Sequence, residues 1–246
     1  MLTPAFRTEW LDETHSTNAL AAERAQSGER GPVWIAARRQ NAGRGRRGRA
    51  WSSLDGNLFT TGLFTFSVEP ADAAQLSFAA ALAVAEVCDI ALKHPEAVQV
   101  KWPNDVLVHD RKVAGILLES GGAPGGGLWL AVGIGVNVAT APKDVERPAI
   151  SLRDAGGKLE REAALDQLAR AFQKHVMSWQ TAGFGPIRDK WLARAKGLGQ
   201  PCEVRLEHEA LTGVFGDLGP DGSLRLDLAS GEHRYISAGD VYFPGR

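Results

Sequence analysis

The architecture follows from the segment Val33-Trp34-Ile35-Ala36-Ala37-Arg38-Arg39-Gln40-Asn41-Ala42-Gly43-Arg44-Gly45-Arg46-Arg47-Gly48-Arg49, which precedes an apolar run at residues 58–66. Residues 33–37 have the pattern of a buried strand, and residues 58–66, rich in Thr and Phe, have that of a second strand. Between them, residues 38–49 (the arginine loop) carry six arginines and three glycines. Because like charges repel and glycine leaves the backbone unconstrained, we predict a mobile loop that joins two strands and is ordered by a polyanion.

The rest of the first 198 residues predicts an α+β fold with a central mixed β-sheet flanked by helices. Ser16, Thr17 and Asn18 supply capping groups for a helix that begins near Thr17 and ends near Gly28. Residues 73–93 are apolar on nearly every side, as expected of a helix that packs on a sheet. Further helices are predicted at residues 162–179 and 186–196, and further strands at residues 98–101, 105–108, 112–119 and 128–138.

From about residue 198 the chain changes to short alternating runs separated by glycine turns, such as Pro220-Asp221-Gly222. This pattern is typical of a small β module. We therefore predict two domains, residues 1–198 and residues 199–246. A module of roughly 48 residues lies near the lower limit for independent stability, so we expect it to lean on the larger domain. Its predicted strands are residues 202–206, 211–218, 224–228 and 234–236.

Composition argues against several classes of protein. A net charge of -1 and a pI near 6.6 over 246 residues disfavour a basic nucleic-acid coat, so we expect the partner of the arginine loop to be small. The two cysteines are too few for a disulfide framework, and we expect Cys88 to be a buried thiol. We find no signal sequence and no apolar stretch near the roughly 20 residues of a membrane span, so we expect a cytoplasmic protein with no membrane partner. The six histidines have no metal-ligand spacing, and no metal-binding residue is predicted.

Gly43, Gly45 and Gly48 match the spacing of the dinucleotide-binding fingerprint, but the sequence after them does not fit it. That fingerprint needs a helix directly behind the glycines, whereas residues 51–57 are turn sequence ahead of a strand. A Walker-type phosphate loop is also missing, so we expect arginine side chains to hold phosphate. Taken alone, the arginine loop has a second interpretation as a solvated surface segment.

Three further motifs carry groups that suit the same ligand. The turn Lys101-Trp102-Pro103-Asn104-Asp105 would project an amide and a carboxylate from the sheet edge. Lys112 opens an apolar strand, where its ammonium needs an anion to compensate its charge. Gly133 and Gly135 weaken a strand, but they let another molecule approach the backbone closely. Four separate segments therefore point at one ligand.

Five motifs agree in order and spacing, and they are Ser16-Thr17-Asn18, Gln40 with Gly43-Arg44-Gly45-Arg46-Arg47-Gly48-Arg49 and Trp51, Lys101-Trp102-Pro103-Asn104-Asp105, Arg111-Lys112-x-Ala114-Gly115-Ile116-Leu117-x-Glu119, and Gly133-Ile134-Gly135-x-Asn137. Together they resemble the biotin protein ligase family from about residue 9 to the end of the chain. The resemblance implies a catalytic domain with a mixed sheet like that of class II aminoacyl-tRNA synthetases, and a C-terminal SH3-like β-barrel. It also implies a two-step reaction, in which biotin and MgATP give biotinyl-5′-AMP and a lysine of a biotin carboxyl carrier protein then takes the biotin.

The resemblance also implies a biotin site. Hydroxyl and amide groups would hydrogen-bond the neutral ureido ring, and glycine backbone would line the same pocket. Lys112 would bridge the biotin carboxylate and the α-phosphate of ATP, and with Arg46 it would oppose the charge that grows in the transition state. The implied biotin-binding residues are Ser16, Thr17, Asn18, Gln40, Gly43, Arg44, Arg46, Lys112 and Gly115.

For the nucleotide, the resemblance implies that arginines engage the phosphates and that Mg²⁺ arrives with ATP, close to Asn104. We assign Asp105, as a hypothesis, to receive or orient the incoming lysine, because an amine with a pKa of about 10.4 must lose its proton before it attacks. The predicted ATP-binding residues are Arg46, Arg49, Trp51, Asn104, Lys112 and Asn137, and the predicted catalytic residues are Lys112, Arg46 and Asp105.

Some relatives carry a DNA-binding winged-helix domain ahead of the catalytic part. Only 15 residues precede Ser16 here, so we expect no DNA partner. Two rival functions stay open: a lipoate-protein ligase, which shares the fold and the adenylation chemistry, and a non-catalytic nucleic-acid-binding protein that uses the arginine loop and the β module. The sequence also leaves open the oligomeric state, a homodimer included, and the identity of the carrier protein beyond its class.

Overall fold

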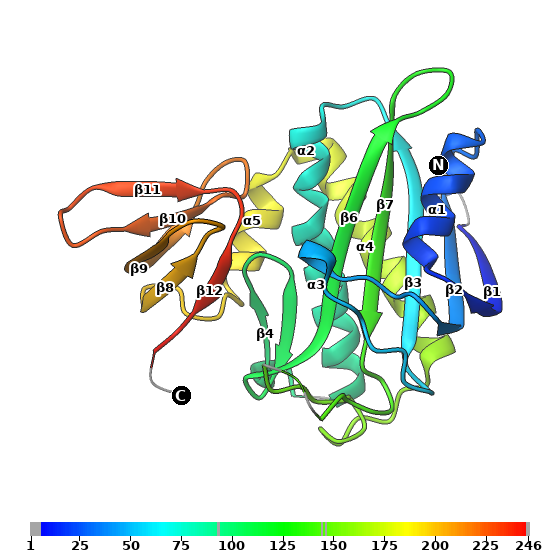
Figure 1. Cartoon of the computed structure of the whole chain (residues 1–246), viewed down its shortest axis with the longest axis horizontal. Coiled ribbons are helices and arrows are strands. Elements are labelled where there is room, and N and C mark those ends of the chain that lie inside the picture. The colour runs from blue at the N-terminus through cyan, green and yellow to red at the C-terminus, as the bar shows by residue number, and fades with distance from the viewer. Residues whose placement is uncertain (1–5, 93, 144, 146, 245–246) are drawn as a thin grey trace.

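The computed structural model describes residues 6–92, 94–143, 145 and 147–244, and its larger part is built on one mixed sheet (Figure 1). Within these residues, seven strands lie in the order β1-β2-β3-β7-β6-β5-β4. The strands are β1 (Arg7–Thr14), β2 (Val33–Gln40), β3 (Leu58–Phe66), β4 (Val98–Lys101), β5 (Asp105–Val108), β6 (Arg111–Gly122) and β7 (Leu128–Val136). β1 runs parallel to β2, whereas the other neighbouring pairs are antiparallel. This confirms the predicted mixed sheet and shows that the arginine loop joins two paired strands.

Helices cover both faces of the main sheet. They are α1 (Thr17–Gln26), α2 (Pro70–Ala74), α3 (Leu76–Leu92), α4 (Arg161–Ala182) and α5 (Gly185–Leu192), with 3₁₀ turns η1 (Arg46–Gly48) and η2 (Pro95–Ala97). Val33 and Ile35 of β2 pack with α1, whereas Trp34 and Ala36 belong to the cluster that contains α3 and α4. Successive residues of a strand point to opposite faces, so a strand covered on both sides is apolar along its length.

The C-terminal residues form a second, antiparallel sheet, drawn in orange and red in Figure 1. Its strands are β8 (Pro201–Arg205), β9 (Ala210–Leu218), β10 (Leu224–Asp227), β11 (His233–Ile236) and β12 (Asp240–Tyr242). They lie in the order β11-β10-β9-β8-β12, so β11 and β12 are the two ends of the described sheet. The predicted β module is confirmed as a second sheet, while its closure into an SH3-like barrel stays a prediction.

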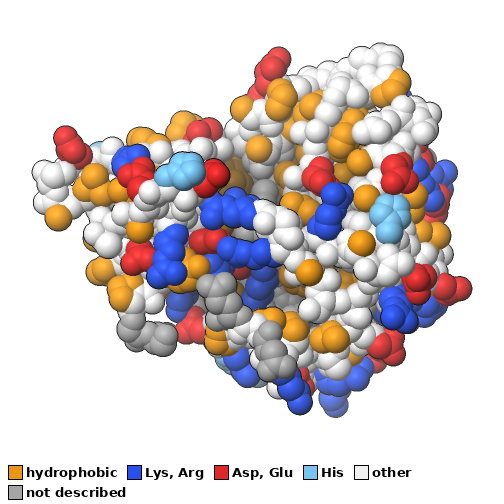
Figure 2. All heavy atoms as spheres, in the orientation of Figure 1, with side chains coloured by type: hydrophobic (Ala, Val, Ile, Leu, Met, Phe, Trp, Pro, Cys, Tyr) orange, Lys and Arg blue, Asp and Glu red, His pale blue; other side chains and the backbone are white. Residues whose placement is uncertain are grey.

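The second sheet packs against the larger part of the chain through aromatic contacts. The ring of Phe215 in β9 lies 6.5 Å from that of Trp191 in α5, and Trp191 lies 5.4 Å from Phe78 in α3. Trp102 Nε1 donates a hydrogen bond to the carbonyl of Gly222 over 3.1 Å. These residues belong to one continuous hydrophobic cluster, and a domain division at residue 198 stays a prediction. Figure 2 shows Lys and Arg side chains gathered at the junction of the two parts.

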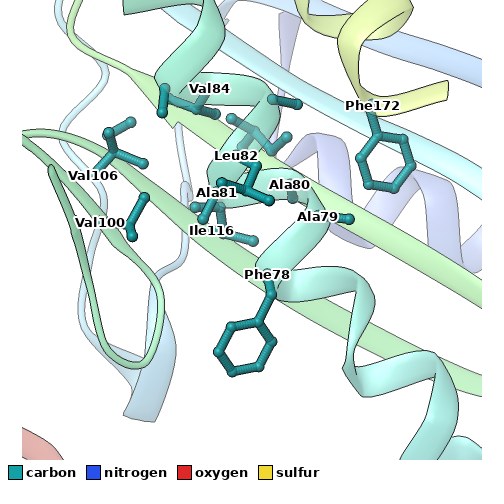
Figure 3. Close-up of a cluster of buried hydrophobic side chains, with 14 of the residues drawn as sticks. Phe78, Ala79, Ala80, Ala81, Leu82, Val84, Val100, Val106, Ile116 and Phe172 are labelled. Atoms are coloured by element: carbon teal, nitrogen blue, oxygen red, sulfur yellow. The ribbon is translucent and has the colours of Figure 1, made fainter. Parts of the chain in front are cut away.

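The core lies between the main sheet and α3. Figure 3 shows Phe78 and Leu82 of this helix beside Val100 and Ile116 of the sheet. Among the described residues, one helical stretch, Pro70–Leu92, is long and apolar enough to cross a bilayer, although we expected no stretch of that length. Of its most apolar window, 67% is buried inside the protein, so the core already uses this surface.

Candidate active site

A cavity of about 260 Å³ opens where the N-terminus of α1, the arginine loop and β5 to β7 meet the first residue of β12. This volume is near the lower end of small-molecule sites, which hold roughly 300–1,000 Å³. A larger, open hollow of about 1,130 Å³ beside α4, α5 and β9 contains none of the predicted residues. Gly43 packs just outside the cavity, where a Cβ would lie 2.9 Å from the Trp51 carbonyl oxygen. The predicted residues that line the cavity are Ser16, Thr17, Asn18, Gln40, Arg44, Arg46, Arg49, Trp51, Asn104, Asp105, Lys112, Gly115 and Asn137.

One wall of the cavity is polar and uncharged. Ser16 is the N-cap of α1, and its hydroxyl accepts a hydrogen bond from the Ala19 amide at 3.4 Å. Gln40 Oε1, at the end of β2, accepts from the backbone N–H of Thr17 at 2.8 Å and from its hydroxyl at 3.2 Å. The capping signal that begins the helix therefore also places these groups, which suit a neutral ligand with its own donors and acceptors.

Asn18 fastens α1 to the sheet. Its Nδ2 donates to Glu119 Oε2 at 2.8 Å, and its Oδ1 accepts from the Thr61 hydroxyl at 2.7 Å. A Cβ on Gly133 would lie 2.0 Å from Asn18 Oδ1, so this strand position has no room for a side chain. The amide is thus already engaged by the protein, and the predicted contact of Asn18 with biotin stays a prediction.

The indole of Trp51 lies on two paired glycines. Gly115 of β6 faces Gly135 of β7, and a Cβ would lie 2.9 Å from the ring at Gly115 and 2.4 Å at Gly135. We expected the glycines of β7 to admit another molecule, but at Gly135 a side chain of the protein takes that space. Trp51 Nε1 is buried and has no hydrogen-bond partner within the described chain. The ring thus forms an apolar floor that carries one unused donor.

Lys112 and Asp105 form the charged centre of the cavity. Lys112 Nζ lies 2.7 Å from Asp105 Oδ1, without the alignment of a hydrogen bond, and 5.3 Å from the centre of the Trp51 ring. Asp105 is 4% exposed and is the first residue of β5, where it faces Gly115 across the ladder. The lysine that we expected to need an anion therefore has one supplied by the protein.

The arginine loop reaches over the cavity and contacts three parts of the fold. Arg46 Nη1 lies 3.4 Å from Asn104 Oδ1, and burial lowers the pKa of Arg46, with Asp240 opposing that shift. Arg49 Nη2 lies 2.7 Å from Asp240 Oδ2, and Arg44 Nη2 lies 3.5 Å from a carboxylate of β6. No α-helix follows the loop glycines, as predicted, since residues 49–57 lead directly to β3.

Sequence reasoning quoted Arg47 in a motif without assigning it to the site, and it missed two further charged residues of this cavity, Arg147 and Asp240. Arg147 lies 3.5 Å from Asp105, 3.2 Å from Asp240 and 5.0 Å from the centre of the Tyr242 ring. Burial alone would raise the pKa of Asp240, but Arg49 and Arg147 hold it below its ordinary value. Neither residue stands in a recognisable motif, so no local signal marked them.

The charges that line the cavity are strongly unbalanced. Six cationic side chains face two carboxylates, which leaves a surplus that suits a polyanion. Within the described chain, there is no group of three or more His, Cys, Asp or Glu side chains that could hold a metal ion. The cations are Arg44, Arg46, Arg47, Arg49, Lys112 and Arg147, and the carboxylates are Asp105 and Asp240.

Asn137 lines the cavity directly after the end of β7. Its Nδ2 lies 3.4 Å from the Lys112 carbonyl oxygen and 3.3 Å from that of Ile150. It therefore ties the end of β7 to the start of β6. Its predicted contact with the nucleotide stays a prediction.

Comparison with known proteins shows which family the chain resembles. The model of the Biotin/lipoate A/B protein ligase family matches residues 10–138, and that of the Biotin protein ligase C terminal domain matches residues 197–243. A biotin–[acetyl-CoA-carboxylase] ligase of Paracoccus denitrificans is 42% identical over 96% of this chain and 100% of its own length. One of Mycobacterium tuberculosis is 34% identical over 93% of this chain and 86% of its own length.

Solved structures agree with the sequence comparison. The biotin protein ligase from Aquifex aeolicus in complex with biotin and ATP superposes with a TM-score of 0.79 at 26% identity, over 96% of this chain and 97% of that one. The match spans both sheets, so the arrangement of the two parts is shared as well as the main sheet. The chain belongs to the biotin protein ligase family.

Proposed function

We propose that this protein activates biotin as biotinyl-5′-AMP at the expense of ATP and then transfers biotin to a lysine of a biotin carboxyl carrier protein. The observation that carries the proposal is a single cavity with a neutral hydrogen-bonding wall at one end and a surplus of cationic side chains at the other. Biotin has the matching polarity, with a neutral ureido ring and an anionic carboxylate. ATP supplies the polyanion that the remaining cations suit.

In the first step, Ser16, Thr17 and Gln40 hold the ureido ring, and the chain of biotin runs over the Trp51 indole toward Lys112. The carboxylate oxygen attacks the α-phosphorus of ATP, a new P–O bond forms, and the bond to the β-phosphate oxygen breaks to release pyrophosphate. Arg46, Arg49 and Lys112 oppose the charge that develops on the phosphoryl oxygens. Mg²⁺ enters on the phosphates of ATP as part of the substrate. Asn104, Asn137 and Trp51 are the remaining proposed nucleotide contacts.

In the second step, the amine of the carrier lysine attacks the carbonyl carbon of the mixed anhydride, and AMP leaves with the bonding electrons. The amine must first lose a proton, and Asp105 is the carboxylate best placed to receive or orient it. Lys112 and Arg147 both lie near this carboxylate, so its availability depends on the phosphates drawing those cations away.

The Asp105→Asn variant tests the transfer step separately from the formation of biotinyl-AMP. We expect it to slow transfer from preformed biotinyl-AMP by about 10²–10⁴-fold, the usual contribution of a positioned acid or base. Asp166→Asn is the matched control, since it makes the same change at an exposed carboxylate of α4 that does not line the cavity. Transfer at the wild-type rate by Asp105→Asn would remove the proposed role.

Lipoate-protein ligase is the closest alternative, since one matching family model covers both activities. The polar wall of Ser16, Thr17 and Gln40 favours biotin, because the dithiolane ring of lipoate has no strong donors or acceptors to pair with it. A nucleic-acid-binding function is disfavoured because the cations gather around one cavity instead of along a continuous face.

The proposal also includes a cytoplasmic location and no DNA partner. Cys88 and Cys202 are both free and buried, and burial raises the pKa of Cys88 to about 12 and that of Cys202 to about 11. Thiols of this kind fit a reducing compartment without requiring one.

Calorimetry tests the proposal directly. We expect biotin to bind alone and its affinity to rise when a non-hydrolysable MgATP analogue is present, because the anionic ligand neutralises the cations around the biotin carboxylate. Lipoate in the same cell should give no comparable heat. Binding of lipoate in preference to biotin would overturn the assignment, as would tight binding of RNA or DNA with no response to biotin.

A further inference from the structure

Asp240 is the one described residue of the second sheet that lines the cavity. It is the first residue of β12, where it pairs with Arg205 of β8, and its side chain is 12% exposed. The rest of the cavity is built by the main sheet, α1 and the loops that join them. Among the described residues, the second sheet therefore contributes to the site through the carboxylate of Asp240.

Three arginines from two distant segments converge on this carboxylate. Asp240 Oδ2 lies 2.7 Å from Arg49 and 3.4 Å from Arg47, both in the arginine loop. Asp240 Oδ1 lies 3.2 Å from Arg147, in the connection that follows β7. Arg147 in turn lies 3.5 Å from Asp105. A chain of opposite charges thus runs from the second sheet to the centre of the cavity.

The second sheet holds Asp240 firmly. The ring of Tyr242, two residues further along β12, lies 5.0 Å from the guanidinium of Arg147 and 4.1 Å from that of Arg205. In β9 of the same sheet, Asp217 pairs with Arg188 of α5 at 2.6 Å, and the Leu218 carbonyl accepts a hydrogen bond from Arg188 at 2.8 Å. The carboxylate therefore belongs to a paired strand of a sheet that is docked on α5, whereas the arginines that it gathers belong to loops.

Arginines this close repel one another, and the loop that carries two of them is rich in glycine. We propose that Asp240 is a positioning residue for adenylate formation, acting through Arg49 and Arg147. Its fixed carboxylate offsets the repulsion and holds both guanidiniums at the cavity before ATP arrives, so that ATP does not have to order them. The inference rests on the proposed biotin-adenylating function, and Asp240 itself touches no substrate in it.

The test compares Asp240→Asn, which removes the charge and keeps the shape, with Asp227→Asn, which removes a carboxylate of β10 in the same sheet that does not line the cavity. We expect Asp240→Asn to lower kcat for biotinyl-AMP formation by about 10- to 100-fold, the usual effect of small misplacements in a site. Affinity for biotin alone should stay within about twofold, since the neutral wall is untouched. Asp227→Asn should keep kcat, and Asp240→Glu should recover part of the loss.

A double-mutant cycle separates positioning from general damage. If Asp240 acts through Arg49, then Arg49→Gln with Asp240→Asn should be little slower than Arg49→Gln alone. Fully additive losses would overturn the proposal. A lower KM for ATP with unchanged kcat would also overturn it, because the carboxylate would then merely compete with phosphate.

Limited trypsin digestion gives a readout that needs no activity. In the absence of ligands, we expect cleavage within residues 46–49 to be faster in Asp240→Asn than in wild type or Asp227→Asn, at equal melting temperature. Equal cleavage in all three proteins would contradict the positioning role. If wild type makes no biotinyl-AMP, the proposed function fails, and the digestion still decides whether Asp240 holds the loop.

Discussion

Lys112 and Asp105 form an ion pair in the resting cavity. The pair is 2.7 Å apart and Asp105 is 4% exposed, so removal of Lys112 would leave a buried carboxylate whose remaining cation is Arg147 at 3.5 Å. The sequence predicted the lysine, because an ammonium at the start of an apolar strand needs an explanation. It also predicted Asp105, but as a partner of the incoming amine and not of Lys112, since pairing between β5 and β6 sets their distance.

Replacement of Lys112 by Met tests its part in activation. We expect Lys112→Met to lower the rate of adenylate formation by about 10²–10³-fold, the usual cost of one preorganised donor. Pyrophosphate release with biotin and MgATP measures the effect. Lys174→Met is the control, because Lys174 lies on the surface of α4 near Glu86. Wild-type rates in Lys112→Met would show that the ammonium does not act on the reacting phosphate.

Lys101 gives a prediction about pH. Burial lowers its pKa from 10.5 to about 8, and Arg147 adds to that shift. Between these values the folded protein has lost the proton that the unfolded chain still binds, so stability rises with pH across this window. In the Lys101→Met variant, the side chain at this position has no titratable group. We therefore expect wild type to gain stability relative to Lys101→Met above about pH 8, by at most about 1.4 kcal/mol per pH unit, in urea unfolding. A difference that stays constant with pH would contradict the lowered pKa.

At the scale of elements, the arginine loop is the part of the site that sequence describes best. Its two strands, its lack of a following α-helix and its position beside the site were all predicted, because alternation and glycine content are local properties. The contact between Trp51 and Gly135 was not, since it depends on how the returning chain crosses β6 and β7. Of the two glycines that looked open to a ligand, Gly135 lies against this indole and Gly133 lies against Asn18.

A methyl group on β7 should displace the indole. A Cβ at Gly135 would lie 2.4 Å from the Trp51 ring, so we expect Gly135→Ala to weaken biotin binding and to shift tryptophan fluorescence. Gly122→Ala, in β6, is the control because an added Cβ there meets nothing within 4 Å. Equal biotin affinity in both variants would show that the contact of Trp51 with Gly135 does not affect biotin binding.

The arginine loop should also keep the activated intermediate from water and from other amines. We expect Arg46→Gly to release biotinyl-AMP and to label lysines of unrelated proteins, because the loop loses its contact with Asn104. Arg39→Gly, at an exposed position near the end of β2 that does not line the cavity, should keep target selectivity. Labelling patterns by mass spectrometry compare the two, and unchanged selectivity in Arg46→Gly would count against shielding.

At the scale of the whole molecule, the sequence predicted two parts of the chain and predicted that the smaller part depends on the larger one for stability. It did not predict that both parts contribute residues to the cavity. β1 was missed because it is a polar edge strand, and β12 because it has only three residues. Arg49 and Asp240 are 191 positions apart, so no periodicity or spacing could connect them. Shared motifs indicated the family, whereas the closing of the cavity by the second sheet required the three-dimensional arrangement.

The measurement that tests the account most directly is mass spectrometry of the protein incubated with biotin and MgATP, before and after addition of a biotin carrier domain. The account predicts biotinyl-AMP bound to the protein first, and then one biotin on a single carrier lysine with AMP released. Absence of biotinyl-AMP from folded wild-type protein, or formation of lipoyl-AMP in its place, would contradict it.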